Sequence, residues 1–398
     1  MTRAYPPMMG TRLRAIRRAH GMSLQTLATV VQKSVAYLSQ VESGKRGLDR
    51  HSMILALAAA LGTGPEALTS LPVPEPGNGD FGSAIEAVRQ ALLAVQRRHP
   101  GGQLLTLDAL QALSTTASDA HRGGQRPDEV GAATAKLTRD LHSAIETGED
   151  TTALLELAVR FHAGTTLGWL RVTGAPVDLR LQAADLVRHA AHSVDTPGAL
   201  SLAAWGGLSA MIDAGLIGLA RAELDAVEVS PLCPESTQLV GTLTLCRALL
   251  AAVDSRTAEA EAMFDQAGQL ADDIGEGDAF GMRFGPTTVA VWHMYGLLEL
   301  GDFTKAARIG AGLYSLDALS PLDQADYWVT YGRALARVRD RCADAALALC
   351  RAEEISPHRL YRDPFARDLI AELLYRSRGP AVDPDLHDMA RRCGLVSE

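Results

Sequence analysis

A chain of 398 residues is long enough to form two or more domains, each with its own hydrophobic core. Hydrophobic residues make up 47% of the sequence but aromatic residues only 5%. This balance favours close-packed helices over strands, which prefer β-branched and aromatic residues. The net charge of −9 would argue against binding to nucleic acid if it were spread evenly along the chain.

The charge is not spread evenly. Residues 1–70, which we call the head, contain nine Lys and Arg against three Asp and Glu, so the head carries +6 and the remaining body −15. Any attraction for phosphate is therefore concentrated in the head, and we expect the body to be repelled by DNA. The arginine-containing N-terminus has no apolar h-region, which predicts a cytoplasmic protein without a secretory signal.

Five short helices are predicted within the head, at residues 10–19, 24–31, 35–42 and 52–61, with a last turn that opens at Pro65. Ser23 and Ser34 are placed to cap the second and third helices, and Gly21 to end the first. Two short helices joined by a tight turn, with a basic loop after the second, form a unit that reads the major groove of DNA.

The segment SLQTLATVVQKSVAYLSQVESGKR, residues 23–46, resembles the helix-turn-helix of the Cro and lambda-repressor-like (XRE-type) family. The resemblance rests on Leu27-Ala28, on the run Ser34-x-x-Tyr37-Leu38-Ser39-Gln40-Val41-Glu42, and on Gly44-Lys45-Arg46. It implies that residues 35–42 are the recognition helix. The base-reading positions would then be Val35, Ala36, Ser39 and Gln40. The phosphate contacts would come from Ser23, Gln25, Tyr37, Ser43, Lys45 and Arg46.

Chemistry gives these positions distinct roles. The amide of Gln40 offers a donor and an acceptor together to adenine, whereas Val35 and Ala36 suit a thymine methyl group.

Two positions depart from the family pattern. Leu24 stands where the family often has Gln, so that phosphate contact passes to Gln25 or Ser23. Gln32 stands where the family usually has Gly, so it must adopt a left-handed conformation or reshape the turn.

A Pro- and Gly-rich stretch at residues 71–82, LPVPEPGNGDFG, predicts a linker between the domains. It contains the letters of a G-x-G-x-x-G fingerprint, but these follow prolines rather than a strand, so we expect no dinucleotide cofactor.

After the linker, apolar residues recur at helical spacing, and no convincing strand is predicted. Residues 83–198 are expected to form a helical N-terminal part of a sensor domain. The most membrane-like stretch, 202–220, is interrupted by Asp213 and four glycines and predicts a buried helix pair.

Residues 199–398 show degenerate helix-pair repeats. Trp328-x-x-Tyr331-Gly332-x-x-Leu335, followed by Ala345 and Ala352, looks like a tetratricopeptide repeat, and the predicted turns near 215, 255, 301 and 340 lie about forty residues apart. Such pairs stack into an α-solenoid with a concave surface that binds peptides or folded partners. Candidates for that surface are the aromatic residues and one histidine of the body, although each is more often a core residue: Trp169, Trp205, Phe284, Trp292, His293, Tyr295, Trp328 and Tyr331.

No pattern predicts catalysis. His189 and His192 lie three residues apart on one helical face, but no Cys or third strong ligand accompanies them, so we expect no metal. The chain has no H-E-x-x-H or G-x-S-x-G motif and no phosphate-binding loop.

A Cro-like head joined to a repeat body resembles the bacterial regulators of the Rgg and PlcR type, which sense short signalling peptides in quorum sensing. The resemblance implies a cytoplasmic homodimer on a two-fold DNA operator, controlled by a peptide, small molecule or partner in the repeat domain. The alternative is a non-enzymatic adaptor whose head docks a protein partner and does not bind DNA.

Overall fold

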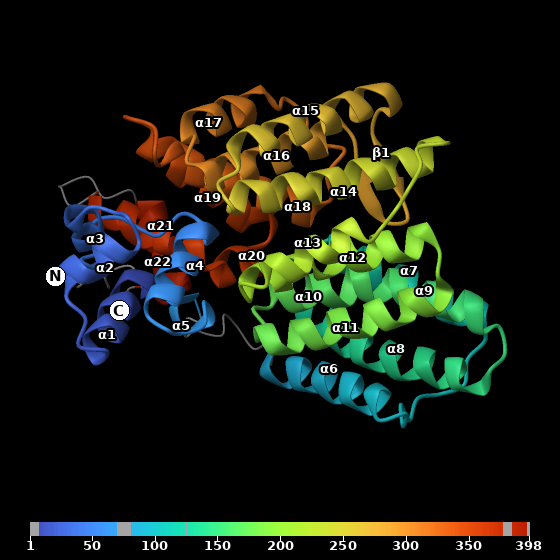
Figure 1. The fold of residues 1–398 in the computed structure, drawn as a ribbon. Helices are drawn as coiled ribbons and strands as arrows, with labels where there is room; N and C mark the ends of the chain where they lie inside the picture. The colour runs from blue at the N-terminus through green and yellow to red at the C-terminus, as the bar shows by residue number, and fades with distance from the viewer. Residues whose placement is uncertain (1–7, 70–80, 125, 377–383, 396–398) are drawn as a thin grey trace.

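The structure, a computed structural model, describes residues 8–69, 81–124, 126–376 and 384–395. It confirms the all-α prediction: a helical head is followed by a large body of packed helices (Figure 1).

One small hairpin departs from the prediction that no strand is present. Strands β1 (Gly277–Ala279) and β2 (Met282–Phe284) pair antiparallel. Phe280 and Gly281 form the turn, with φ angles of 60° and 76°. Both values lie in the left-handed region that hairpin turns of this length require and that a side chain such as Phe rarely adopts.

The head contains the five predicted helices around one core. They are α1 (Met8–Ala19), α2 (Leu24–Val30), α3 (Val35–Glu42), α4 (His51–Ala60) and α5 (Glu66–Thr69). The predicted caps are present: the hydroxyl of Ser23 accepts from the Thr26 amide and that of Ser34 accepts from the Tyr37 amide, each at 3.0 Å. Gln32 adopts the left-handed conformation, with φ at 52°, so the turn between α2 and α3 keeps its shape without Gly.

The predicted linker, 71–82, lies almost wholly outside the described residues. Its last two positions are helical, because α6 begins at Phe81. The helical segment that was expected to follow is present. It contains α6 (Phe81–Gln96), α7 (Leu107–Arg122), α8 (Pro127–Thr147), α9 (Thr151–Phe161), the π-helical turn η1 (His162–Thr166), α10 (Leu167–Val172) and α11 (Val177–Val194).

The remaining chain folds as helix pairs, and all four predicted turns lie between paired helices. The helices are α12 (Pro197–Asp213), α13 (Ile217–Asp225), α14 (Pro234–Val253), α15 (Thr257–Ile274), α16 (Pro286–Leu300), α17 (Phe303–Gly312), α18 (Pro321–Leu335), α19 (Cys342–Ile355), α20 (Pro357–Arg362), α21 (Pro364–Arg376) and α22 (Pro384–Arg392). Small residues bring the helices close together. A Cβ atom added to Gly296 would lie 2.4 Å from the ring of Phe264, and one added to Gly310 would lie 2.4 Å from the ring of Tyr331.

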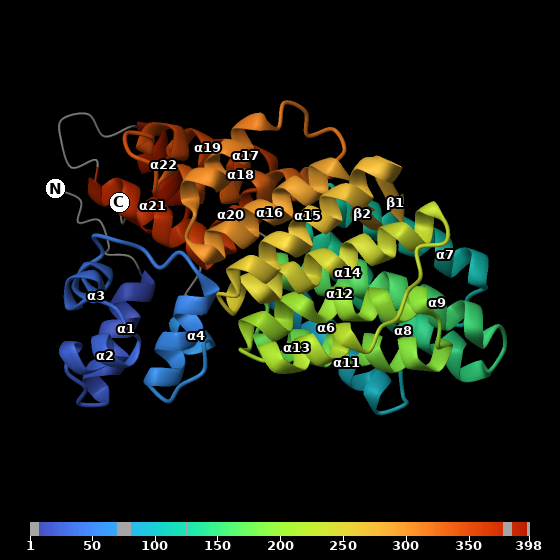
Figure 2. The ribbon, with the colours of Figure 1, turned by 45° about the horizontal axis from the view of Figure 1, so that its top comes forward.

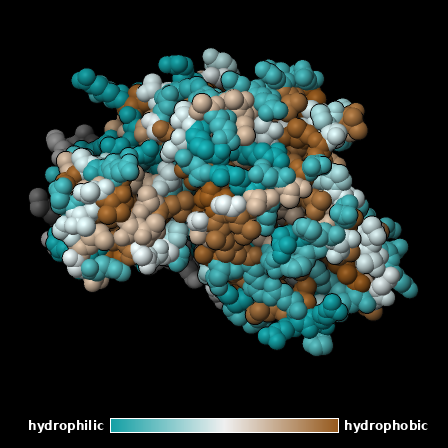
Figure 3. Space-filling view, in the orientation of Figure 1, coloured by the Kyte–Doolittle hydropathy of each residue, from teal (hydrophilic) through white to brown (hydrophobic). Residues whose placement is uncertain are grey.

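The body has two blocks of helices, α6–α13 and α14–α19, and the chain then returns to the head through α20–α22 (Figures 1 and 2). The last helices of the chain consequently lie beside its first ones. Figure 3 shows an apolar area in the middle of one face. The exposed large apolar residues include Leu216, just before α13, and Leu219 of α13, which are 39% and 51% exposed. Among the described helices, α14 is long and apolar enough to cross a membrane, but 67% of its most apolar window is buried inside the fold.

The head is held against the body by carboxylates that accept hydrogen bonds from its backbone. On α21, Asp368 accepts from the amides of Met9 at 3.2 Å and Leu48 at 3.3 Å, and Glu372 accepts from the amide of Gly47 at 2.8 Å. These amides belong to the start of α1 and to the loop after α3. The body therefore fixes the two segments that flank the helix-turn-helix unit.

A buried arginine joins the two sides of this contact. Arg337, at the end of α18, donates to both carboxylate oxygens of Glu372 and to Asp49 of the head, each at 2.8 Å. The side chains are almost completely buried, with 8% exposure for Arg337 and 0% for Glu372. A buried carboxylate that loses its cation is strongly disfavoured, so Asp49 and Glu372 both depend on Arg337.

We predict that Arg337→Ala lowers the free energy of unfolding by about 3 kcal/mol, since Asp49 and Glu372 lose a buried partner. Urea denaturation of the full chain measures the loss. The matched control is Arg351→Ala, which removes an exposed partner of Glu354, with 64% and 61% exposure, and should cost less than about 0.5 kcal/mol. Equal effects of the two substitutions would contradict the role given to Arg337.

Candidate functional site

Helix α3, the predicted recognition helix, is fixed from behind by α1. The guanidinium of Arg17 donates to both oxygens of Glu42, at 2.6 and 2.7 Å, and also to the carbonyl of Met22. Gly10 lets α1 approach α3 closely, because a Cβ atom there would lie 2.0 Å from the carbonyl oxygen of Val41. The inner face of α3 is therefore held, and its outer face is presented to solvent.

The side chains predicted to read bases lie on that outer face. Ala36, Ser39 and Gln40 are exposed and Val35 is half-buried. Leu38 and Val41, between them in sequence, are buried in the head core. The helix is thus divided into a core side and an outward polar side, as a major-groove reader requires.

The residues predicted to bind phosphate are arranged less uniformly. Ser23, Gln25, Ser43 and Lys45 are exposed. The hydroxyl of Ser23 is engaged at the α2 cap, where it contacts both the amide and the hydroxyl of Thr26.

Tyr37 is turned inward, which the sequence did not indicate. Arg46 lies over the Tyr37 ring at 5.1 Å, and the Tyr37 hydroxyl is buried with no hydrogen-bond partner among the described residues. Burial raises the pKa of this hydroxyl. Tyr37 therefore supports Arg46 from below rather than facing a phosphate itself.

The exposed charges of the described head residues are mostly positive. Two of its three carboxylates are internal: Glu42 pairs with Arg17, and Asp49 pairs with Arg337. Among the described head residues, the exposed cations are Arg14, Arg18, Lys33 and Lys45. Positive charge therefore gathers on the same small module as the outward face of α3, which suits a polyanion.

A cavity of about 1230 Å³ lies between the head and the two blocks of the body. The head contributes His51, Ile54 and Leu55 of α4, so a molecule in the cavity would touch the head directly. The π-helical turn η1 contributes to the opposite wall. Such turns interrupt regular helix geometry and recur at functional sites.

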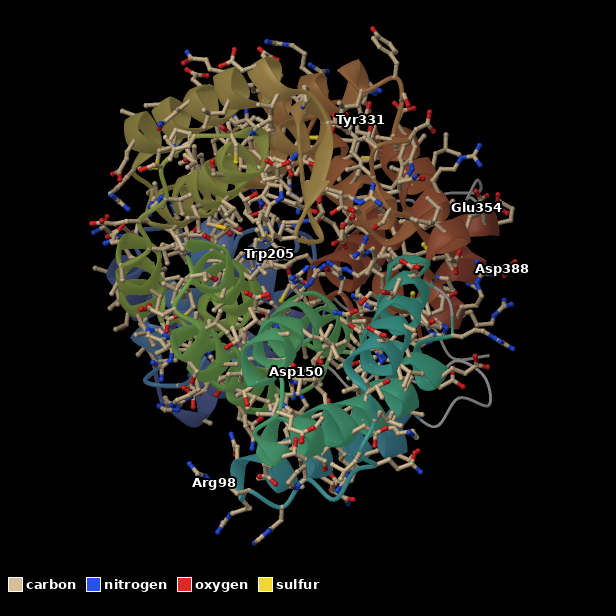
Figure 4. The ribbon with its side chains drawn as sticks, turned by 90° about the vertical axis from the view of Figure 1, so that its right-hand side faces the viewer. Arg98, Asp150, Trp205, Tyr331, Glu354 and Asp388 are labelled. Atoms are coloured by element: carbon tan, nitrogen blue, oxygen red, sulfur yellow. The ribbon has the colours of Figure 1, made fainter. Side chains whose placement is uncertain are left out.

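Three of the eight sequence candidates for ligand binding line this cavity: Trp205, Trp292 and Tyr295. Figure 4 shows Trp205 near the middle of the molecule and Tyr331 well away from it.

The other five candidates do not line the cavity, for packing reasons. Trp169 and Phe284 are core residues, with 1% and 0% exposure. His293 stacks on Phe264, with ring centroids 4.7 Å apart. Trp328 and Tyr331 pack on the core of the last helix pairs. Aromatic spacing alone could not separate the residues that wedge helices from those that face the cavity.

One side of the cavity holds a network of buried charges. Asp326 of α18 accepts from Arg171 at 2.8 Å and from Arg359, and Arg359 also donates to Asp363 at 2.8 Å. Burial on its own would raise the pKa of Asp326, but the two arginines outweigh it and lower that pKa. With Trp205 and Trp292 on other parts of the wall, the cavity is apolar in part and charged in part.

His51 connects the cavity to the head. It begins α4, and the carboxylate of Glu299 on α16 accepts from the backbone amides of His51 at 3.0 Å and Ser52 at 3.1 Å and from the His51 ring at 2.8 Å. Asp213 lies 3.5 Å from the other ring nitrogen. A residue of the body therefore caps a helix of the head. Nothing in the sequence of either segment signals this contact, because Glu299 and His51 are 248 residues apart.

The imidazole of His51 is held in its charged form. Burial would lower its pKa, but the charges and hydrogen bonds of Glu299 and Asp213 raise the pKa of His51 to about 10.

Among the described residues, no group of three or more His, Cys, Asp and Glu side chains is placed to hold a metal ion.

Comparison with known proteins identifies one region. Residues 9–71 match a family described as a helix-turn-helix domain, which covers the head and leaves the body unmatched. No curated protein and no solved structure matches the chain.

We predict that His51→Gln reduces stability by an amount that depends on pH. The pKa of His51 is raised from 6.5 to about 10, so its stabilising effect is complete below about pH 6.5 and is lost as the pH rises to 10. The difference in urea midpoint between the wild type and His51→Gln should be largest near pH 6 and disappear near pH 10. The exposed His20 offers a control, and His20→Gln should give no such trend. A difference that stays constant with pH would contradict the charged state of His51.

Proposed function

We propose that this chain is a sequence-specific DNA-binding transcription regulator whose operator binding is controlled by a ligand in the cavity. DNA binding is supported by the helix-turn-helix match and by the exposure of Ser39 and Gln40 on a basic module. Control by a ligand is supported above all by one observation: α4 of the head forms part of the cavity wall.

The shared wall gives ligand control a physical route. A ligand that fills the cavity contacts His51, Ile54 and Leu55, and these sit on the helix that Glu299 caps. Such a ligand can change the position or mobility of the head relative to the body. It does so only if it binds one arrangement more tightly than the other, because equal affinity for both shifts nothing.

The cavity limits the size of the ligand more than its identity. A volume of about 1230 Å³ exceeds the roughly 300–1,000 Å³ that is usual for small-molecule sites. A short peptide or a large small molecule fits this space. The mixed lining suits a ligand that has both an apolar part and charged or polar groups.

The resemblance to the Rgg and PlcR type adds three further parts to the proposal. The helix pairs of the body act as tetratricopeptide-like repeats of a sensor domain. The protein works as a cytoplasmic homodimer, in which two heads meet the two halves of a DNA site about one helical turn apart. It has no catalytic activity of its own, and its output is occupancy of the operator.

The rival function is that of an adaptor whose head docks a protein and not DNA. Gel shift of genomic fragments across a salt series separates the two, because specific binding to DNA survives competitor DNA and weakens steeply with salt. A head that binds no DNA even at low salt would favour the adaptor.

We predict that Gln40→Ala relaxes sequence preference at one base step by about 1–3 kcal/mol, because an exposed amide that pairs with a base edge is lost. Binding to a library of operator variants measures the change. Lys45→Ala is the comparison: it should weaken binding to all sequences alike and lower the salt slope by about one. An unchanged operator preference in Gln40→Ala would reject the base-reading assignment.

We predict that Ser209→Trp, which places a large side chain in the cavity, abolishes the effect of the ligand on operator binding. The measurement compares operator affinity with and without extract of the host culture, for the wild type and the variant. Ser193→Trp, on the exposed side of α11, is the control and should respond as the wild type does. A full response of Ser209→Trp to the extract would show that control does not act through this cavity.

A further inference from the structure

A second, smaller cavity lies on the outside of the junction between head and body. It has a volume of about 400 Å³ and is formed where the end of α3 and the loop after it face the turn between α18 and α19. From the head it is lined by Gln40, Lys45 and Arg46. These residues were assigned to DNA from the sequence, so the body reaches the edge of the proposed DNA-binding surface.

The part of the body that faces these residues is basic, although the body as a whole carries −15. Its lining contains Arg337, Arg339 and Arg376 against the single carboxylate of Asp340. Asp49 and Glu372 pair with Arg337 beneath this cavity and can be counted with Asp340, which gives three carboxylates. The cations that line the cavity still outnumber them, since there are five: Lys45, Arg46, Arg337, Arg339 and Arg376. An acidic body thus presents a local excess of positive charge where DNA would pass.

Arg339 is the cation of this turn that is free to move. Its side chain is 95% exposed. Its ion-pair partner at 3.5 Å, the neighbouring Asp340, is 89% exposed, so the pair is weak. Arg337 and Arg376, by contrast, are bound to Glu372 and maintain the junction. Arg339 can reorient towards a partner without disturbing the fold.

From this arrangement we infer that Arg339 binds the DNA backbone, next to the phosphate held by Lys45, so that the body extends the DNA-binding surface of the head. The inference rests on the proposed DNA-binding function. Its geometric basis is that Arg339, Lys45 and Gln40 line one small groove, so DNA read by Gln40 brings its phosphates within reach of both cations. The guanidinium group suits phosphate because it can donate two parallel hydrogen bonds.

This contact also gives the body a direct influence on DNA affinity. When the head is docked as observed, Arg339 adds to the cations of the head. When the head moves away from α18, that contribution is lost. The contact between head and body therefore borders the larger cavity on one side, and on the other side it changes the affinity for DNA.

Arg339→Gln in the full-length protein tests the inference. Binding to operator DNA and to an unrelated duplex of equal length is measured across a salt series. The variant should bind both duplexes several-fold more weakly and lower the slope of log affinity against log salt by about one, as loss of one phosphate contact requires. Asp340→Asn should have the opposite effect and strengthen binding to both duplexes.

Arg351→Gln is the matched control. It removes one exposed arginine from α19, outside the groove, and should leave the salt slope unchanged. An Arg339→Gln variant with wild-type affinity and slope, or with tighter binding because the turn obstructs DNA, would overturn the inference while leaving the proposed function in place. If the wild type binds neither duplex at low salt, the proposed function itself fails.

Discussion

Three carboxylates of the body, on Glu299, Asp368 and Glu372, hold the head by accepting hydrogen bonds from its backbone amides. Backbone amides at the start of a helix are unsatisfied by the helix itself, so they offer strong sites for anions. The position of the head therefore depends on these charged atoms together with Phe365 of α21, which packs in the hydrophobic core of the head. Contacts of this kind are sensitive to whatever else binds beside them.

The cavity of about 1230 Å³ lies at this contact. Glu299 and His51 are both part of the cavity wall and part of the junction, and Arg333 donates to the carbonyl of Asp49 while its guanidinium lies 4.3 Å from the ring centre of Phe365. A molecule bound in this cavity would contact residues that already position the head. Coupling between two sites needs a structural element that both of them bias, and in the proposed function the position of α4 is that element.

Much of the head could be predicted from the sequence, because its signals are local. Ser23, Ser34 and Gln32 lie next to the turns that they determine, and each behaves as expected. The cavity could not be predicted, because it is formed by residues far apart in the chain. His51 and Glu299, or Trp205 and Tyr295, meet only after the helix pairs have stacked, and aromatic residues of the core follow the same helical spacing as those of the wall. The hairpin turn at Phe280 was also missed, since a Phe gives no local signal for a left-handed conformation.

The way the head is held also explains how an acidic body can carry a helix-turn-helix domain with a basic surface. If the carboxylates of the body paired mainly with arginines of the head, docking would neutralise the charges that DNA needs. Glu299 and Asp368 instead accept hydrogen bonds from backbone amides. Glu372 accepts from the amide of Gly47 and from arginines of the body. The exposed cations Arg14, Arg18, Lys33 and Lys45 are therefore left available at the surface while the head is docked. Docking therefore uses backbone amides of the head and leaves its exposed cations available for the DNA binding that we propose.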